Sequence, residues 1–185
     1  MKVLAISGSL RAESHNSKLL RAAVELFPAD VDVEIWDGLK DVPPYDEDDD
    51  GADAPAAVER LRSAIAGADA LFFATPEYNH SIPGALKNAI DWASRPSGAS
   101  VFLNKPAAVV GASTGAFGAV WAQAELRKVL GATGARVVDG ELALGHAHER
   151  FDDAGGLRDA NLREELQEVV DALLLVTRAR EAIAA

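Results

Sequence analysis

The sequence predicts an α/β fold in which helices cover both faces of a parallel sheet of five strands. Short apolar runs alternate along the 185 residues with segments whose apolar side chains recur at helical spacing. Most of the short runs are apolar throughout, which is typical of parallel strands that are buried on both faces. The length suits one domain spanning residues 1–185, and neither an internal repeat nor a domain boundary is visible.

The first strand is expected over Lys2–Ser7, an apolar run that is too short for a helix. Apolar side chains share one helical face over residues 16–27, and Pro28 ends that helix. Residues 31–36 read VDVEIW and form a second strand. A long loop is expected over residues 37–55, where paired prolines and five consecutive acidic residues interrupt any periodic pattern.

The rest of the chain continues the alternation. Helices are predicted at residues 55–67, 84–94, 119–130 and 157–184, and strands at 70–74, 107–112 and 136–138, the last continued near 141–144. Because crossovers between parallel strands are right-handed, few topologies remain. Five strands fit the flavodoxin-like order 2-1-3-4-5 of a three-layer sandwich better than a six-stranded dinucleotide-binding fold.

Charge and composition exclude several classes of protein. The net charge of −11 argues against binding to nucleic acid or to anionic membrane surfaces. Without cysteine there are no disulfides, iron–sulfur clusters, Cys-ligated zinc sites or thiol nucleophiles. The first residues lack the long apolar region of a signal peptide, and no run approaches the ~20 apolar residues that span a bilayer. A cytoplasmic location is therefore expected.

Ligands of such sheets bind beyond the carboxyl ends of the strands, and three loops there carry polar residues. The first loop, Gly8–Asn16, leads into a helix whose N-terminus suits a phosphate. Ser9, Ser14 and Asn16 add neutral donors, and Arg11 adds a charged fork. A plain N-cap beside a solvated Arg11 is the alternative. Neither the Walker pattern nor the Rossmann glycine fingerprint is present.

The second loop, residues 75–84, is fixed by two prolines and a glycine between a strand and a helix. Rigid backbone N–H and C=O groups suit the polar edge of a flavin ring, and Tyr78 can pack against an aromatic ligand. Lys87, Asn88 and Asp91 follow on the helix and are interpreted as structural or solvated side chains.

The third loop, residues 113–118, contains Gly115 and Gly118, which permit close approach of a ligand, and Ser113, which can donate a hydrogen bond. An ordinary turn with a Ser cap is the alternative.

Trp92 and Trp121 are expected near the sheet ends, where either can line a nicotinamide pocket. The acidic residues 46–50 could bind a cation, but such runs are usually solvated, so no metal ligand is assigned. His146 and His148 are interpreted as surface residues.

Four segments match a known family in the expected order and together extend over nearly the whole chain. They are GSLRAESHN at 8–16, PPYDED at 43–48, TPEYNHSIPGALKNAIDW at 75–92, and Lys105–Pro106 with the strand that leads to STGAFG. On these segments the chain resembles the NADPH-dependent FMN reductases of flavodoxin-like fold, which include quinone, chromate and azo-dye reductases. One departure is Phe117–Gly118–Ala119, where many relatives carry paired glycines.

The resemblance implies FMN as cofactor and NADPH or NADH as co-substrate. It implies that the phosphate is held around Ser9, Arg11, Ser14, His15 and Asn16. It implies isoalloxazine contacts from Pro76, Glu77, Tyr78 and Asn79, and from the third loop at Ser113 and Gly115. It also implies a small-molecule acceptor, such as a quinone, chromate or an azo dye, and a homodimer or homotetramer with FMN near a subunit interface.

Hydride transfer from nicotinamide to flavin needs no general acid or base, so no catalytic residue is assigned. The expected activity is that of an NAD(P)H-dependent FMN reductase or quinone reductase. A flavodoxin-type FMN electron carrier without NAD(P)H oxidation is the main alternative. A Rossmann oxidoreductase without flavin, and a scaffold whose acidic loop binds a metal or a partner, are the others.

Overall fold

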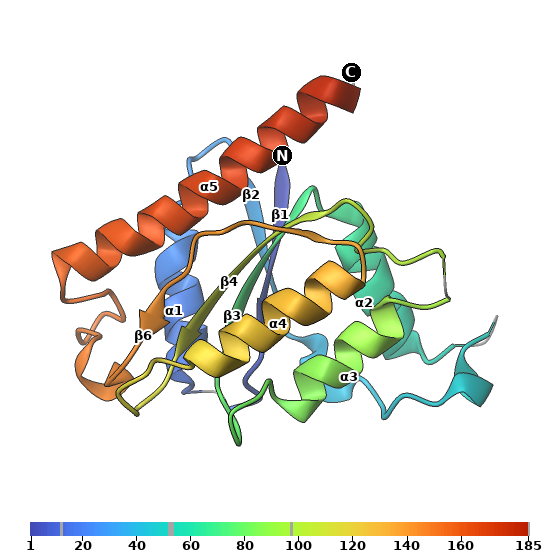
Figure 1. The fold of residues 1–185 in the computed structure, drawn as a ribbon, viewed down its shortest axis with the longest axis horizontal. Coiled ribbons are helices and arrows are strands. Elements are labelled where there is room, and N and C mark those ends of the chain that lie inside the picture. The colour runs from blue at the N-terminus through green and yellow to red at the C-terminus, as the bar shows by residue number, and fades with distance from the viewer. Residues whose placement is uncertain (12, 52–53, 97, 185) are drawn as a thin grey trace.

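A computed structural model describes residues 1–11, 13–51, 54–96 and 98–184, and a parallel sheet lies at its centre (Figure 1). The strands are β1 Lys2–Ser7, β2 Asp32–Trp36, β3 Ala70–Thr75, β4 Pro106–Ala112, β5 Arg136–Val137 and β6 Ala143–Leu144. Their order is β2-β1-β3-β4-β5, with β6 also beside β4, and every pairing is parallel. This confirms the predicted flavodoxin-like order.

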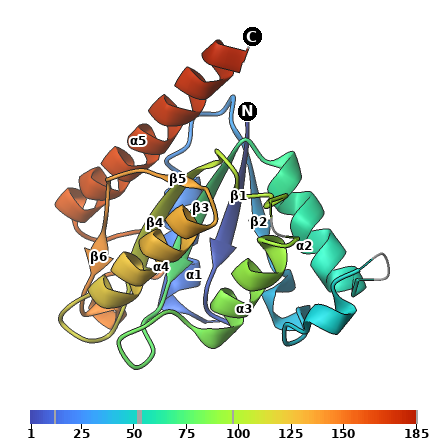
Figure 2. The same cartoon turned by 45° about the vertical axis from the view of Figure 1, so that its right-hand side comes forward.

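Helices cover both faces of the sheet (Figures 1 and 2). One face carries α1 (His15–Val24) and α5 (Ala160–Ala184), and the other carries α2 (Ala56–Gly67), α3 (Gly84–Ala93) and α4 (Val120–Ala132). Every residue of β3 and β4 is buried, as the continuous apolar runs predicted. Alternate residues of β3 serve the two cores: Phe72 packs with α1 and α5, whereas Leu71 and Phe73 pack on the opposite side. None of the helices described is both long and apolar enough to cross a membrane.

Several helix boundaries differ from the sequence prediction by one to three residues; α5, for example, begins at Ala160 rather than at residue 157. Helix α1 ends at Val24 rather than at residue 27. The N–H groups of Leu26 and Phe27 donate to carbonyls three residues back, because the chain leaves the α conformation before Pro28. The predicted loop 37–55 contains two short 3₁₀ helices, η1 (Gly38–Asp41) and η2 (Glu47–Asp49).

Side chains of α2 and α3 hold this loop against the body of the protein. Asp50, the last acid of the run, pairs with Arg62 at 2.6 Å, and both side chains are largely buried. The Asn88 amide accepts from the N–H of Tyr45 and donates to the carbonyl of Pro43, as expected of a structural residue. The indole N–H of Trp92 donates to the same carbonyl, and the Trp92 ring is 0% exposed. The prediction that Trp92 lines a nicotinamide pocket is therefore wrong.

The last predicted strand is broken into β5 and β6, and one arginine occupies the break. Arg127 of α4 donates to the carbonyls of Val109, Val138 and Gly140, the last two of which lie between the two strand segments. Burial lowers the pKa of Arg127, and the guanidinium still satisfies backbone oxygens that lack a neighbouring strand. The chain can thus leave the sheet after Val137 and rejoin it at Ala143 while the carbonyls of Val138 and Gly140 keep a hydrogen-bond donor.

Replacing Arg127 should therefore destabilise the protein. In Arg127→Met three partly buried carbonyls lose their donor, so we expect the free energy of unfolding to fall by roughly 2–4 kcal/mol. Urea denaturation followed by circular dichroism measures the change. The matched control is Arg163→Met, an exposed position on α5 that should shift stability by less than about 0.5 kcal/mol. Equal stabilities for the two variants would contradict the role given to Arg127.

Candidate functional site

A pocket of about 200 Å³ opens at the carboxyl ends of β1, β3 and β4. It is lined by Ser9, Arg11, Ser14, His15, Asn16, Pro76, Glu77, Tyr78, Ala112, Ser113 and Thr114. The fold brings together residues from all three of the loops that the sequence singled out. Of the predicted binding residues, Asn79 and Gly115 do not line this pocket. Sequence reasoning missed Thr114, whose neighbours in the third loop it did select.

The first loop presents the N-terminus of α1 to the pocket. Ser14 is the N-cap of α1, and its hydroxyl accepts a hydrogen bond from the N–H of Asn16. Arg11 is exposed at the rim, and Ala12 beside it lies outside the described residues. The arrangement combines free N–H groups, a helix dipole and one guanidinium, which is a suitable receptor for a phosphate.

The side chain of Asn16 is committed elsewhere. Its amide donates to the carbonyl of Ala112 and accepts from the N–H of the same residue, both at 2.9 Å. Because Asn16 is buried, these two bonds join the start of α1 to the last residue of β4. Asn16 lines the pocket as predicted, but one of the two N–H groups of its amide is already used by the carbonyl of Ala112.

His15 follows the N-cap and packs against the chain that connects β6 to α5. Its ring stacks on Phe151 with a centroid distance of 6.2 Å and an interplanar angle of 11°. Burial lowers the pKa of His15, and the positive charge of Arg11 lowers it further, so the ring is neutral at pH 7. The buried Nδ1 atom has no hydrogen-bond partner among the described residues. It is a polar atom that a bound ligand could satisfy.

The second loop is a rigid hairpin that projects from the end of β3. Tyr78 and Ser81 exchange two backbone hydrogen bonds, at 3.0 and 3.1 Å. The two residues between them, Asn79 and His80, have φ angles of 53° and 60°, as the turn of a tight hairpin requires. Asn and His tolerate this left-handed conformation better than most side chains do. The ring of Tyr78 is 53% exposed and so is accessible to an aromatic ligand.

Glu77 attaches this hairpin to α4. One carboxylate oxygen accepts hydrogen bonds from the N–H groups of Trp121 and Ala122, at 3.1 and 3.2 Å. Helix α4 has no capping side chain of its own, because its N-cap residue is Ala119. The carboxylate therefore satisfies the helix N-terminus and complements its dipole. Trp121 is exposed there and lies edge-on to His80 at 4.9 Å between ring centroids.

The third loop packs backbone to backbone against the residues that follow β6. The N–H groups of His146 and Ala147 donate to the carbonyls of Gly115 and Ser113. At Gly118, with a φ of 58°, an added Cβ would lie 2.2 Å from the backbone of Ala143, so no larger residue fits. The Ser113 hydroxyl accepts from the N–H of Gly115, which is the predicted cap. His146 and His148 are exposed, as expected.

The chemistry available in this pocket is binding rather than proton transfer. Burial lowers the pKa of His15 and so favours the neutral form of this lining residue. No group of His, Asp and Glu side chains among the described residues is placed to hold a metal ion. The strand order and the pocket at the carboxyl ends of the strands define a flavodoxin-like protein with its candidate ligand site at the usual edge of the sheet.

The chain belongs to the NADPH-dependent FMN reductase family, whose model matches residues 1–149. It is 46% identical over 179 residues to an NAD(P)H-dependent FMN reductase of Pseudomonas aeruginosa, with 96% of each chain covered. It is 39% identical over 172 residues to a 2-hydroxy-1,4-benzoquinone reductase of a Burkholderia species, covering 92% of this chain and 93% of that protein.

A solved structure gives the same assignment. The flavoenzyme FerB of Paracoccus denitrificans, an NAD(P)H:(acceptor) oxidoreductase, superposes with a TM-score of 0.88. The two sequences are 37% identical, and the match covers 96% of this chain and 97% of that one. The protein is thus an oxidoreductase of the FMN- and NAD(P)H-dependent type, as the sequence predicted.

Removal of the Asn16 amide tests its structural role. In Asn16→Ala the buried N–H and carbonyl of Ala112 both lose their partner, so the free energy of unfolding should fall by about 2–4 kcal/mol. Urea denaturation of the purified protein measures it. Asn161→Ala, an exposed position in the first turn of α5, is the control and should change stability by less than about 0.5 kcal/mol. A loss below about 1 kcal/mol in Asn16→Ala would refute the assignment.

Proposed function

We propose that the pocket at the ends of β1, β3 and β4 binds FMN, and that the protein uses it to reduce quinones at the expense of NAD(P)H. When bound, FMN supplies the redox chemistry: it accepts hydride from NAD(P)H and passes the electrons to the acceptor. The observation that carries the proposal is the convergence of the three predicted loops on one pocket. The chain itself contributes binding, orientation and polarity, and no catalytic acid or base.

The first loop fits the phosphate of FMN. The N–H groups at the start of α1 and the Arg11 guanidinium provide charge-complementary donors, with Ser9 and the Ser14 hydroxyl beside them. Nδ1 of His15 is buried without a partner and can donate to a phosphate oxygen in one tautomer. The side-chain amide of Asn16 contributes by fixing the loop to β4.

The second and third loops fit the isoalloxazine ring. Pro76 and Tyr78 line the pocket from the hairpin, whose position is set by the hydrogen bonds that Glu77 accepts from α4, and Asn79 lies in the turn of that hairpin. Ser113 and Thr114 line it from the third loop, which the turn after β6 holds through hydrogen bonds to the carbonyls of Ser113 and Gly115. Rigid backbone groups on both sides can meet the polar edge of the ring without reorganisation, which favours tight binding.

The acceptor and the assembly are part of the proposal. Relatives named as quinone reductases support a quinone, and chromate and azo dyes are further acceptors of the same proposal. We propose a homodimer or homotetramer, supported by the exposed aromatic side chains of Tyr78, Phe117 and Trp121 beside the pocket. Solvent-exposed aromatic groups of this kind are enriched at protein interfaces. A cytoplasmic location belongs to the proposal, since NAD(P)H is regenerated in that compartment.

The proposed activity can be measured directly. Recombinant protein should bind FMN, with quenching of the flavin fluorescence, and should oxidise NAD(P)H in the steady state with benzoquinone as acceptor. A flavodoxin-type electron carrier would bind FMN but show almost no such turnover. Protein that neither retains nor quenches FMN would refute the proposal. Binding without turnover would favour the carrier.

The position of the phosphate is tested by comparing two flavins. Arg11→Ala should weaken FMN binding by about tenfold, the factor that corresponds to about 1.4 kcal/mol, because a charge-assisted hydrogen bond is lost. Riboflavin has no phosphate, so its affinity should change little. Fluorescence titration gives both dissociation constants, and Arg163→Ala serves as the control for the loss of a surface charge. Equal losses for the two flavins would remove Arg11 from the phosphate site.

A further inference from the structure

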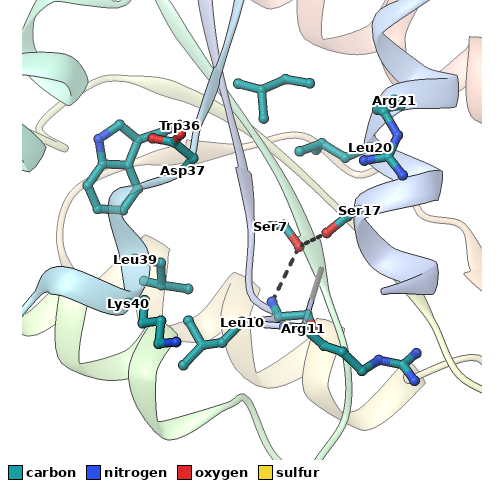
Figure 3. A pocket seen from close by; sticks show the side chains of 12 residues that line it. Ser7, Leu10, Arg11, Ser17, Leu20, Arg21, Trp36, Asp37, Leu39 and Lys40 are labelled. Carbon is teal, nitrogen blue, oxygen red and sulfur yellow. Dashed lines mark hydrogen bonds between the residues drawn. The ribbon is translucent and has the colours of Figure 1, made fainter. Parts of the chain in front are cut away.

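A second hollow lies on the other side of the first loop, between the end of β1, helix α1 and the turn that follows β2 (Figure 3). Its volume is about 300 Å³, which reaches the lower end of the range for small-molecule sites. It shares only Ser9 and Arg11 with the proposed FMN pocket. Ten other residues line it: Ser7, Leu10, Ser17, Leu20, Arg21, Ile35, Trp36, Asp37, Leu39 and Lys40.

This hollow is cationic on a strongly acidic protein. Arg11, Arg21 and Lys40 line it, against the single carboxylate of Asp37, whereas the whole chain carries a net charge of −11. Within the described residues, none of these three cations forms an ion pair. Figure 3 shows the Arg21 and Lys40 side chains on opposite sides of the hollow. An anion bound between them would be contacted from two directions, which favours a doubly charged phosphate over an anion that carries a single charge.

The hollow also has an apolar wall and a hydroxyl floor. Leu10 and Ile35 are 50% and 44% exposed, and both line the hollow. The ring of Trp36 and the side chain of Leu39 extend this wall. The hydroxyls of Ser7 and Ser17 lie 3.1 Å apart at the base, and each keeps capacity for a further hydrogen bond. The matching ligand has a flat apolar body, hydroxyl groups and a phosphate.

We propose that this hollow binds the 2′-phosphoadenosine end of NADPH and thereby favours NADPH over NADH. The proposal rests on the proposed function, which requires a nicotinamide dinucleotide as reductant. Adenine provides the flat body and the ribose provides the hydroxyl groups. The 2′-phosphate, which NADH lacks, is the group for Arg21 and Lys40. In dinucleotide-binding folds, the end of the second strand is likewise where the adenosine ribose and a 2′-phosphate are received.

Binding can be measured without turnover. The probe is adenosine 2′,5′-bisphosphate, titrated calorimetrically into the full-length FMN-loaded protein. It should bind at least about tenfold more tightly than adenosine 5′-monophosphate, which lacks the 2′-phosphate. Arg21→Ala and Lys40→Ala should each weaken the bisphosphate about tenfold by removing one charged donor. Arg163→Ala and Lys128→Ala, which remove exposed charges of the same kinds elsewhere, are matched controls.

Steady-state kinetics gives a second readout. Arg21→Ala and Lys40→Ala should raise KM for NADPH about tenfold and change kcat by less than about twofold, because the 2′-phosphate is far from the transferred hydride. The KM for NADH should rise much less than the KM for NADPH. Titration with excess FMN provides a further comparison: displacement of the bisphosphate by FMN at matching affinity would assign the hollow to a second flavin phosphate and overturn the proposal.

Several results would reject this assignment. One is that the bisphosphate binds no better than the monophosphate, and another is that the control variants weaken it as much as Arg21→Ala and Lys40→Ala do. Either result removes the 2′-phosphate from the hollow even if the protein oxidises NADPH. Conversely, specific bisphosphate binding that depends on Arg21 and Lys40 would uphold the site even if no quinone turnover were found. The two proposals can therefore fail separately.

Discussion

The pair of hydrogen bonds between the Asn16 amide and the backbone of Ala112 is the interaction on which the site depends. It joins two segments 96 residues apart in the sequence and makes the start of α1 continuous with the end of β4. The first loop is otherwise attached to β3 through the N–H of Gly8, and the third loop is otherwise attached to the turn after β6. Because both bonds are buried, their loss would leave the N–H and carbonyl of Ala112 without a partner, so the side chain of Asn16 fixes the first loop relative to the third.

At two other places a side chain likewise hydrogen-bonds to backbone groups of a distant segment. Glu77 reaches from the second loop to the N-terminus of α4, and Arg127 reaches from α4 to the carbonyls between β5 and β6. In each case a side chain satisfies backbone groups that the regular ladder leaves free. Together they connect the second loop, α4 and the broken edge of the sheet into one rigid frame. Such a frame suits a protein whose cofactor performs the chemistry while the chain holds it in place.

The charge distribution complements this frame. The molecule is acidic overall, yet cations gather around the ends of β1 and β2, on both sides of the first loop. Arg11 lies at the boundary between the proposed FMN pocket and the hollow that contains Arg21 and Lys40. A local positive field on an acidic surface attracts phosphorylated small molecules and leaves nucleic acids repelled at long range. Two phosphate-bearing ligands can then be received side by side.

The sequence by itself determined the strand order, the layers and the three loops of the site, because hydrophobic periodicity and turn residues are local signals. It also identified the family through the segments at 8–16 and 75–92. Only the tertiary structure decided how individual polar side chains are used: the Asn16 amide bonds to β4, Glu77 caps α4, and Trp92 is buried. These roles depend on partners 44 to 96 residues away, and no local pattern encodes such distances. The convergence of Arg21 and Lys40 on one hollow likewise exists only after α1 and the turn after β2 have packed against β1.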